Sequence, residues 1–170
     1  MSGSDQKSWP AIEQRRGAER RQRERRNEVA WTPVPLHGPP GDEPALLAAA
    51  RDARLQAHAR YSGFKVGAAL ELPDGTLVTG CNIENATYSL TLCAERVALV
   101  KALSDGHTTF VRIAVAADTE APTPPCGPCR QLLWEYCGDI EVILANLNGA
   151  TARLRLAELL PMPFDDRLLK

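Results

Sequence analysis

Apolar and polar positions along the chain follow the periods of helices and strands. After Pro44, a stretch rich in Ala and Leu continues to Ala59 without Gly or Pro, which predicts a helix. Short apolar runs next to turn residues predict strands. Further helices are predicted over residues 92–103, 127–136 and 156–160, and strands over residues 65–72, 77–82, 111–117, 141–146 and 150–155. This order predicts an α/β fold in which helices cover a five-stranded mixed sheet.

The first 43 residues differ in composition from the rest. Between Met1 and Glu28 there are eight basic and five acidic residues, and residues 32–41 are rich in Pro and Gly. A segment with so few apolar residues cannot offset the entropy that ordering would cost. We therefore expect residues 1–43 to form a basic, disordered tail and residues 44–170 to form the folded domain. A basic arm that contacts nucleic acid or a partner is the alternative interpretation.

Charge and cysteine content narrow the class of protein. The net charge of -1 over 170 residues gives no general attraction to nucleic acid or to anionic membranes. No apolar run approaches the roughly 20 residues that span a bilayer, and the polar N-terminus contains no apolar core of an export signal. The five cysteines are an odd number, which argues against a disulfide framework. A cytoplasmic protein is expected, in which closely spaced cysteines indicate a metal or catalytic site.

A cysteine pair lies at the start of the third predicted helix. Cys126 and Cys129 are three positions apart and so share one face of a helix, where both sulfurs can reach one ion. Cys93 also lies at a predicted helix start, and both helices follow strands, so their N-termini can meet at one end of the sheet. Three thiolates favour a tetrahedral zinc site whose fourth position is open to water. We therefore predict that these three cysteines bind zinc.

Other interpretations of the cysteines remain. A redox pair would need a thioredoxin-like context, which the predicted elements do not supply. A structural zinc site would need a fourth thiolate from Cys81, in a predicted strand, or from Cys137, at a predicted helix end. Neither of these has a second cysteine at metal-binding spacing, so we interpret both as packing residues. Arg96 and two positive helix ends are placed to draw negative charge from three thiolates.

Glu95 is the candidate acid-base residue, because it follows Cys93 by two positions at the same helix start. In the otherwise apolar stretch 92–103 the only charged residues are Glu95, Arg96 and Lys101, so this helix is predicted to be largely buried. A buried carboxylate needs a partner or a chemical task. An ordinary carboxylate at a favourable helix N-terminus is the alternative, and the three thiols nearby argue against it.

Several ordered motifs resemble the zinc-dependent nucleoside deaminases. The zinc signature is Cys93-Ala94-Glu95, followed by Pro-Cys-Gly-Pro-Cys at residues 125–129. The resemblance extends over residues 61–69, 80–86, 93–96 and 158–161, and the stretch 44–164 as a whole is similar to the short, homotetrameric cytidine deaminases. Arg60 stands where that family usually has Pro, and Pro128 stands where Ala is commoner. The resemblance implies a three-layer α/β/α fold.

The resemblance also implies a reaction and a set of site residues. The reaction would be hydrolytic deamination of cytidine and deoxycytidine to uridine and deoxyuridine, with release of ammonia, a step of pyrimidine salvage. Cys93, Cys126 and Cys129 would bind one Zn²⁺ per subunit. The other implied roles are Glu95 as the catalytic proton shuttle, Arg96 beside the ligands, Asn82 and Glu84 on the ribose hydroxyls, Phe64 against the base, Tyr88 at the far end of the ribose, and Phe164 from a neighbouring subunit.

Three other functions are compatible with parts of this pattern. Deaminases of other aminopyrimidines, such as the blasticidin type, resemble the chain at the zinc motif but lack a match to residues 82–85. A polynucleotide editor would need an open groove, whereas Asn82 and Glu84 imply a closed nucleoside pocket. A protein that uses zinc only for folding has no use for an open fourth position or for Glu95. Membrane and nucleic-acid partners are therefore not expected.

Overall fold

The computed structural model describes residues 42–169, and its elements follow the predicted order. The helices are α2 (Glu43–Leu55), α3 (Ala94–Ser104), α4 (Gly127–Cys137) and α5 (Leu156–Leu159). The strands are β1 (Val66–Glu71), β2 (Leu77–Cys81), β3 (Arg112–Ala117), β4 (Glu141–Ala145) and β5 (Thr151–Arg155). The short 3-10 helices η1 (Tyr88–Leu90) and η2 (Asp166–Leu168) were not predicted. Apart from residues 42 and 43, the predicted N-terminal tail lies outside the described residues.

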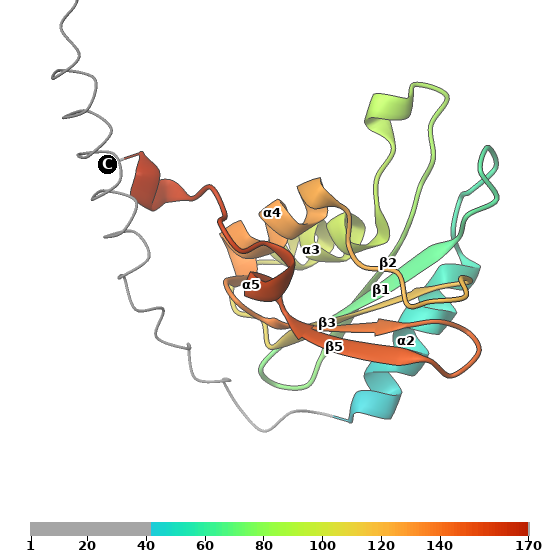
Figure 1. Cartoon of the computed structure of the whole chain (residues 1–170), viewed down its shortest axis with the longest axis horizontal. Coiled ribbons are helices and arrows are strands. Elements are labelled where there is room, and N and C mark those ends of the chain that lie inside the picture. The colour runs from blue at the N-terminus through green and yellow to red at the C-terminus, as the bar shows by residue number, and fades with distance from the viewer. Residues whose placement is uncertain (1–41, 170) are drawn as a thin grey trace, which may run out of the picture. The chain divides into compact units, whose positions relative to one another are not determined.

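The strands form one five-stranded sheet in the order β2-β1-β3-β4-β5. Strand β1 is antiparallel to β2 and β3, β3 is parallel to β4, and β4 is antiparallel to β5. Helix α2 packs on one face, and α3, α4 and α5 lie on the other (Figure 1). Every residue of β1 and β3 is buried, because helices cover both faces of the central strands. The predicted three-layer α/β/α architecture with a mixed sheet is confirmed.

Alternate residues of the strands divide the core into two apolar clusters. Ala68 and Leu70 of β1 belong to the larger cluster, which includes buried residues of α3, α4 and α5. Ala69, between them, belongs to a smaller cluster with Leu46 and Ala50 of α2. This alternation is the period of two that a strand imposes on its side chains. None of the described helices is both long and apolar enough to cross a membrane.

Two glycines let helices approach the sheet closely. A Cβ atom on Gly67 of β1 would lie 2.0 Å from the carbonyl oxygen of Ala50 in α2. A Cβ atom on Gly80 of β2 would lie 2.4 Å from the carbonyl oxygen of Ala94 in α3. Both contacts are with backbone atoms, so neither position accepts a side chain without moving a helix. The absence of a side chain at Gly80 therefore allows the first turn of α3 to pack directly against the sheet.

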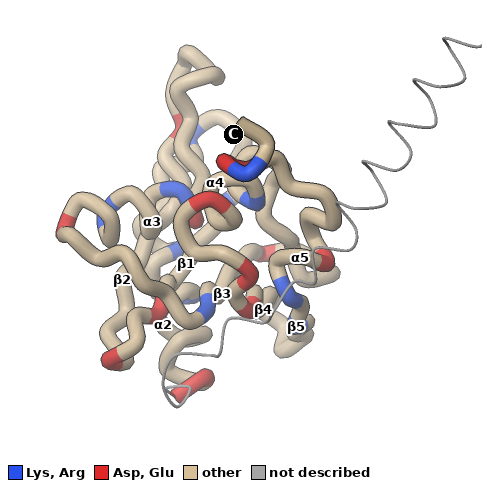
Figure 2. The backbone as a smooth tube through the Cα atoms, turned by 90° about the vertical axis from the view of Figure 1, so that its left-hand side faces the viewer, with Lys and Arg blue, Asp and Glu red and all other residues tan. Residues whose placement is uncertain are grey.

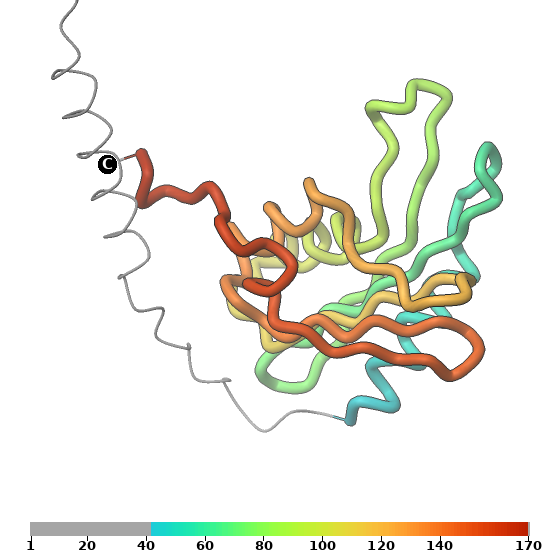
Figure 3. Tube along the Cα trace, in the orientation of Figure 1, coloured from blue at the N-terminus to red at the C-terminus, as the bar shows by residue number. Residues whose placement is uncertain are grey.

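Helix α2 ends at Leu55, four residues earlier than predicted. The backbone N–H of His58 donates to the carbonyl oxygen of Asn82 at 2.9 Å, and the N–H of Glu84 donates to the carbonyl oxygen of His58 at 2.9 Å. This pairing with a distant segment replaces the helical hydrogen bonds that local propensity favours. It brings the loop before β1 beside the loop after β2, and both loops extend from the same end of the sheet (Figure 3).

Candidate active site and metal centre

The three predicted zinc ligands lie together at the N-termini of α3 and α4. Cys93 is the N-cap residue of α3, Cys126 is that of α4, and Cys129 is in the first turn of α4. Their sulfur atoms all lie within 4.8 Å of one another, with 3.6 Å between the sulfurs of Cys93 and Cys126. Three thiolates around one zinc ion, with Zn–S distances of about 2.3 Å, would lie about 3.8 Å apart. The donor set and its spacing therefore fit one zinc ion.

The cysteine cluster is closed on one side and open on the other. Cys129 is 1% exposed, Cys93 is half-buried, and Cys126 is exposed. Three protein ligands leave one position of a tetrahedral ion for a further ligand. Because the cluster is open at Cys126, that ligand can reach the ion from solvent.

Hydrogen bonding and charge set the ionisation of the thiols. The thiol of Cys129, then that of Cys126 and the charge of Arg96, lower the pKa of Cys93 to about 6 against the opposing effect of burial. The pKa of Cys129 is raised, because its thiol donates to Cys93 and is buried. The N-termini of α3 and α4 carry positive partial charge, which stabilises thiolates further. Cys93 therefore ionises more readily than Cys129.

Glu95 lies in the first turn of α3 and is 4% exposed. Burial raises the pKa of its carboxyl to about 7, and repulsion from Cys93 adds to this, while Arg96 and the thiol of Cys129 act in the opposite direction. A carboxyl with a pKa near neutrality can both accept and donate a proton at physiological pH. The Nε atom of Arg96 is buried without a hydrogen-bond partner among the described residues, so a free donor remains beside this site.

The loop that leads into Cys126 is held by two polar residues that the sequence analysis missed. Arg130 donates from Nε to the carbonyl oxygen of Pro125 at 2.7 Å, and from Nη1 to a carbonyl oxygen of α5 at 2.9 Å. Asn146, which is buried, donates from Nδ2 to the carbonyl oxygen of Glu120 at 2.8 Å. In the sequence, these two residues are marked only by their positions, an Arg directly after the last ligand and an Asn at the end of a strand. Both patterns are too common to predict a role near the site. These contacts fix the approach of Cys126 to the other ligands.

A pocket of about 350 Å³ is lined by residues that precede the cysteine cluster in the sequence. Its lining residues come from the two paired loops and are Tyr61, Ser62, Glu84, Tyr88 and Thr91. Thr91 is two residues before Cys93, so the lining of the pocket leads directly into a metal ligand. Glu84 is the only charged residue among those that line it.

Glu84 is fixed by hydrogen bonds from the loop before β1. Its carboxylate accepts from the backbone N–H of Tyr61 at 2.7 Å, from that of Ser62 at 3.2 Å, and from the Ser62 hydroxyl. These bonds, first that from the hydroxyl, lower the pKa of Glu84. The carboxylate therefore remains ionised and available as an acceptor in the pocket. Nothing in the local sequence pattern identifies Ser62 as a partner of Glu84.

Asn82 is buried and holds the segment that carries Phe64. Its Oδ1 accepts from the backbone N–H of Val66 at 2.8 Å, and its Nδ2 donates to the carbonyl oxygen of Phe64 at 2.9 Å. A side-chain amide has two N–H donors, so one remains for another acceptor. Phe64 itself is 40% exposed. Asn82 thus positions Phe64 as well as offering a polar group of its own.

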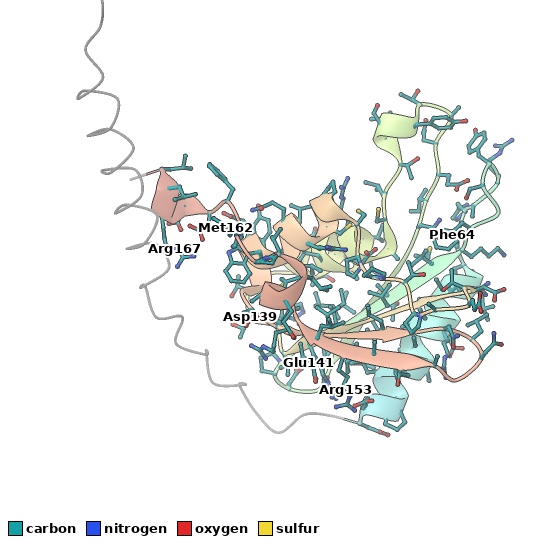
Figure 4. All side chains as sticks on the ribbon, viewed as in Figure 1. Phe64, Asp139, Glu141, Arg153, Met162 and Arg167 are labelled. Carbon is teal, nitrogen blue, oxygen red and sulfur yellow. The ribbon has the colours of Figure 1, made fainter. Side chains whose placement is uncertain are left out.

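The aromatic residues of the predicted site do not all come together in one chain. Tyr88 lines the pocket and is largely exposed. Phe164 is also exposed, but Met162 and Arg167, which flank it, lie at the opposite end of the domain from Phe64 (Figure 4). The single chain therefore separates Phe164 from the residues with which it was grouped.

The remaining two cysteines lie outside the cluster. Cys81 in β2 donates from Sγ to the carbonyl oxygen of Gln56 at 3.3 Å. Cys137 packs against the larger apolar cluster, and burial raises the pKa of its thiol to about 12. All five cysteines are free, and neither of these two shares the group of potential ligand atoms. Their surroundings agree with a packing role.

Known proteins share this sequence and this fold. The family model described as "Cytidine and deoxycytidylate deaminase zinc-binding region" matches residues 42–145. A cytidine deaminase of Sporosarcina psychrophila is 52% identical over 124 residues, which are 72% of this chain and 91% of the relative. The crystal structure of cytidine deaminase from Burkholderia pseudomallei has a TM-score of 0.71 at 46% identity and covers 72% of this chain and 99% of that chain. For the cytidine deaminase structure from Mycobacterium tuberculosis, the TM-score is 0.64 at 37% identity, over 74% of this chain and 98% of that chain.

The fold and the metal centre therefore define a zinc-binding hydrolytic enzyme, with Cys93, Cys126 and Cys129 as the ligands of one zinc ion per subunit. The chain belongs to the cytidine deaminase family. Its resemblance to that family, first indicated by short motifs, is confirmed by the family model over residues 42–145 and by a relative that aligns over 124 residues.

Proposed function

We propose that the chain deaminates cytidine and deoxycytidine to uridine and deoxyuridine, releases ammonia, and thereby serves pyrimidine salvage. The observation that carries this proposal is the position of Glu95, a buried carboxyl in the helical turn that follows the zinc ligand Cys93. The pocket lined by Glu84 also includes Thr91, two residues before that ligand. Relatives named cytidine deaminase support this choice of substrate.

In this reaction a water molecule supplies the oxygen that replaces the amino group at C4 of the cytosine ring. Zinc bound to the three cysteines supplies the Lewis acid that activates water, as is general for zinc-dependent deaminases. Glu95 moves the protons: it accepts one from water and delivers it to ring atom N3, and it then takes the second from the new hydroxyl at C4 and delivers it to the departing amino group. Burial next to the ligand sulfurs keeps this carboxyl away from bulk water, so the proton passes between enzyme and substrate.

The sugar is placed in the pocket. The ionised Glu84 accepts from ribose hydroxyls, and the remaining N–H of Asn82 donates to them. Phe64 packs against the base, and Tyr88 approaches the far end of the ribose. Phe164 reaches the site of a neighbouring subunit, because in its own chain it lies away from Phe64 (Figure 4).

A homotetramer in the cytoplasm is the assembly that we propose. Exposed apolar side chains support burial between subunits: Val100 on α3 is 56% exposed and Phe164 is 57% exposed. Five free cysteines, three of which are metal ligands, suit a reducing compartment. Size-exclusion chromatography with light scattering tests the assembly, and a monomeric active enzyme would contradict it.

A polynucleotide substrate is disfavoured by the charge of the domain. Residues 42–170 contain 12 basic and 16 acidic residues. Basic and acidic positions are intermingled along the described backbone and form no continuous basic stripe in this view (Figure 2). A groove that binds a nucleic-acid strand needs clustered Lys and Arg. A small nucleoside fits this charge distribution better.

The test is ultraviolet absorbance and ammonia release from zinc-loaded protein mixed separately with cytidine, deoxycytidine, free cytosine and blasticidin S. We expect turnover of both nucleosides and none of free cytosine, because free cytosine has no ribose for Glu84 and Asn82 to bind. Turnover of blasticidin S alone would move the substrate to another aminopyrimidine. Inactivity toward all four compounds with zinc bound would contradict the proposed function.

A further inference from the structure

Arg130 connects the metal centre to helix α5. Its Nε atom donates to the carbonyl oxygen of Pro125 at 2.7 Å, and its Nη1 atom donates to the carbonyl oxygen of Leu159, the last residue of α5, at 2.9 Å. Its backbone N–H donates to the carbonyl oxygen of Cys126 at 3.0 Å. One half-buried residue, which directly follows Cys129 in the sequence, thus joins α5 to the segment that carries Cys126.

The two helices that carry the metal ligands begin differently. The residue before Cys93 exchanges two backbone hydrogen bonds with Ile83, at 2.9 Å and 3.0 Å. The residue before Cys126 is Pro125, which has no N–H group, and two of the three residues that precede it are also prolines. Backbone pairing therefore fixes the approach to Cys93, whereas the carbonyl before Cys126 is held by a side-chain donor.

The carbonyl group of Leu159 also lacks a donor from its own helix. In a longer helix it would accept from the N–H of the residue four positions later, but that residue is Pro163. The guanidinium of Arg130 supplies this donor. Because a guanidinium is planar and holds its N–H groups in a rigid fork, two acceptors bonded to it are fixed relative to each other. The position of α5 therefore sets the position of the loop before Cys126.

Helix α5 is itself held by the core. Its Leu156 side chain is fully buried in the larger apolar cluster, and the backbone N–H of Ala157 donates to the buried carboxylate of Asp139 at 2.8 Å. The helix packs against α4 on the same face of the sheet (Figure 1). The carbonyl group at its end is therefore a fixed support that does not depend on the metal.

We propose that Arg130 is a positioning residue that raises the affinity of the cysteine cluster for zinc, because it holds Cys126 in the ligand group before the metal binds. Cys126 is the exposed ligand and begins its helix after a proline-rich loop, so its backbone depends on this support. Removal of a residue that orients a metal ligand from outside typically lowers metal affinity about 10–100-fold. The inference concerns metal binding, so it is independent of which compound the enzyme deaminates.

The experiment measures the zinc affinity of the full chain, without substrate, by competition with a chromophoric chelator. Arg130→Ala removes the guanidinium, and Arg130→Lys keeps a positive charge near the thiolates but lacks the planar fork. Gln131→Ala is the matched control, because Gln131 is the next residue on α4 and its side chain donates instead to the carbonyl oxygen of Phe164. Urea unfolding of the metal-free proteins measures what each side chain contributes to the fold alone.

We expect zinc affinity to fall about 10–100-fold in Arg130→Ala, to fall by a smaller factor in Arg130→Lys, and to stay at the wild-type value in Gln131→Ala. Unchanged affinity in Arg130→Ala would overturn the inference, even with a loss of urea stability. Wild-type affinity in Arg130→Lys would also overturn it, because charge alone would then account for the effect. An equal fall in Gln131→Ala would do the same, since any loosening of α4 would then suffice. If Arg130→Ala does not fold, Arg130→Lys and the control decide by these criteria.

Discussion

The backbone N–H of Tyr61 donates a 2.7 Å hydrogen bond to the carboxylate of Glu84, although 23 residues separate them in the chain. This bond connects the loop before β1 to the loop after β2, and the pocket is formed where these loops meet. The carboxylate that holds the loop is also the acceptor that we assign to the ribose. Under the proposed function, loop structure and substrate binding depend on the same carboxylate, and variants of its hydrogen-bond partners can separate the two roles.

Ser62→Ala should make ligand binding more sensitive to acid. The Ser62 hydroxyl is the strongest influence that lowers the pKa of Glu84 below its ordinary value of 4.5. In the wild type, Glu84 therefore stays ionised as the pH falls to 4.5, whereas in Ser62→Ala its pKa rises and part of it becomes protonated there. We expect the affinity for uridine, measured by calorimetry at neutral pH and at pH 4.5, to fall more steeply in Ser62→Ala. Ser104→Ala, at the exposed end of α3, is the control, and equal pH dependence in all three proteins would contradict the prediction.

Glu95→Gln should abolish most turnover while keeping the metal. The amide has nearly the same shape as the carboxyl but cannot move a proton, so kcat for cytidine should fall by about 10²–10⁴-fold. Zinc content and melting temperature should be retained, because the exchange removes a buried ionisable group without removing a ligand. Glu135→Gln changes an exposed carboxylate on α4 and serves as the control. Near-normal kcat in Glu95→Gln would show that another group moves the proton.

Removal of zinc by a chelator should abolish activity without unfolding the domain. Neither Cys93 nor Cys126 belongs to the two apolar clusters, which hold the sheet and its helices together independently of the metal. Far-ultraviolet circular dichroism should therefore be retained, the melting temperature should decrease, and added zinc should restore turnover. Complete loss of secondary structure on chelation would instead identify zinc as a requirement for folding.

Gly67→Ala should destabilise the domain by about 3 kcal/mol or more, because the added Cβ would overlap backbone atoms of Ala50 and Arg54 in α2. Relief of this overlap requires α2 to move away from β1. Gly127→Ala is the control, since a Cβ atom there would meet nothing within 4 Å and its backbone angles suit any residue. The measurement is urea unfolding of the zinc-loaded proteins. Equal stability of the two variants would contradict this account of Gly67.

Much of the fold and the metal centre followed from the sequence because the signals are local. The strand predicted over 111–117 corresponds to β3 (Arg112–Ala117), and the helix predicted over 127–136 corresponds to α4 (Gly127–Cys137). Both predictions succeeded because apolar periodicity and helix-start signals depend only on residues that are close in the sequence. The ligand group of Cys93, Cys126 and Cys129 also followed, because two thiols share one helical turn and the third lies at another helix start.

Contacts between distant segments could be decided only by the tertiary structure. Three features depend on contacts between segments that are distant in the sequence: the early end of α2 at Leu55, the support of Glu84 by Ser62, and the hydrogen bond by which Arg130 connects the start of α4 to the end of α5. No local pattern selects such partners, because each polar side chain has many possible acceptors until the backbone is placed. The sequence by itself thus determined the elements and the metal ligands, whereas packing of the loops determined the shape of the pocket and the separation of Phe164 from it.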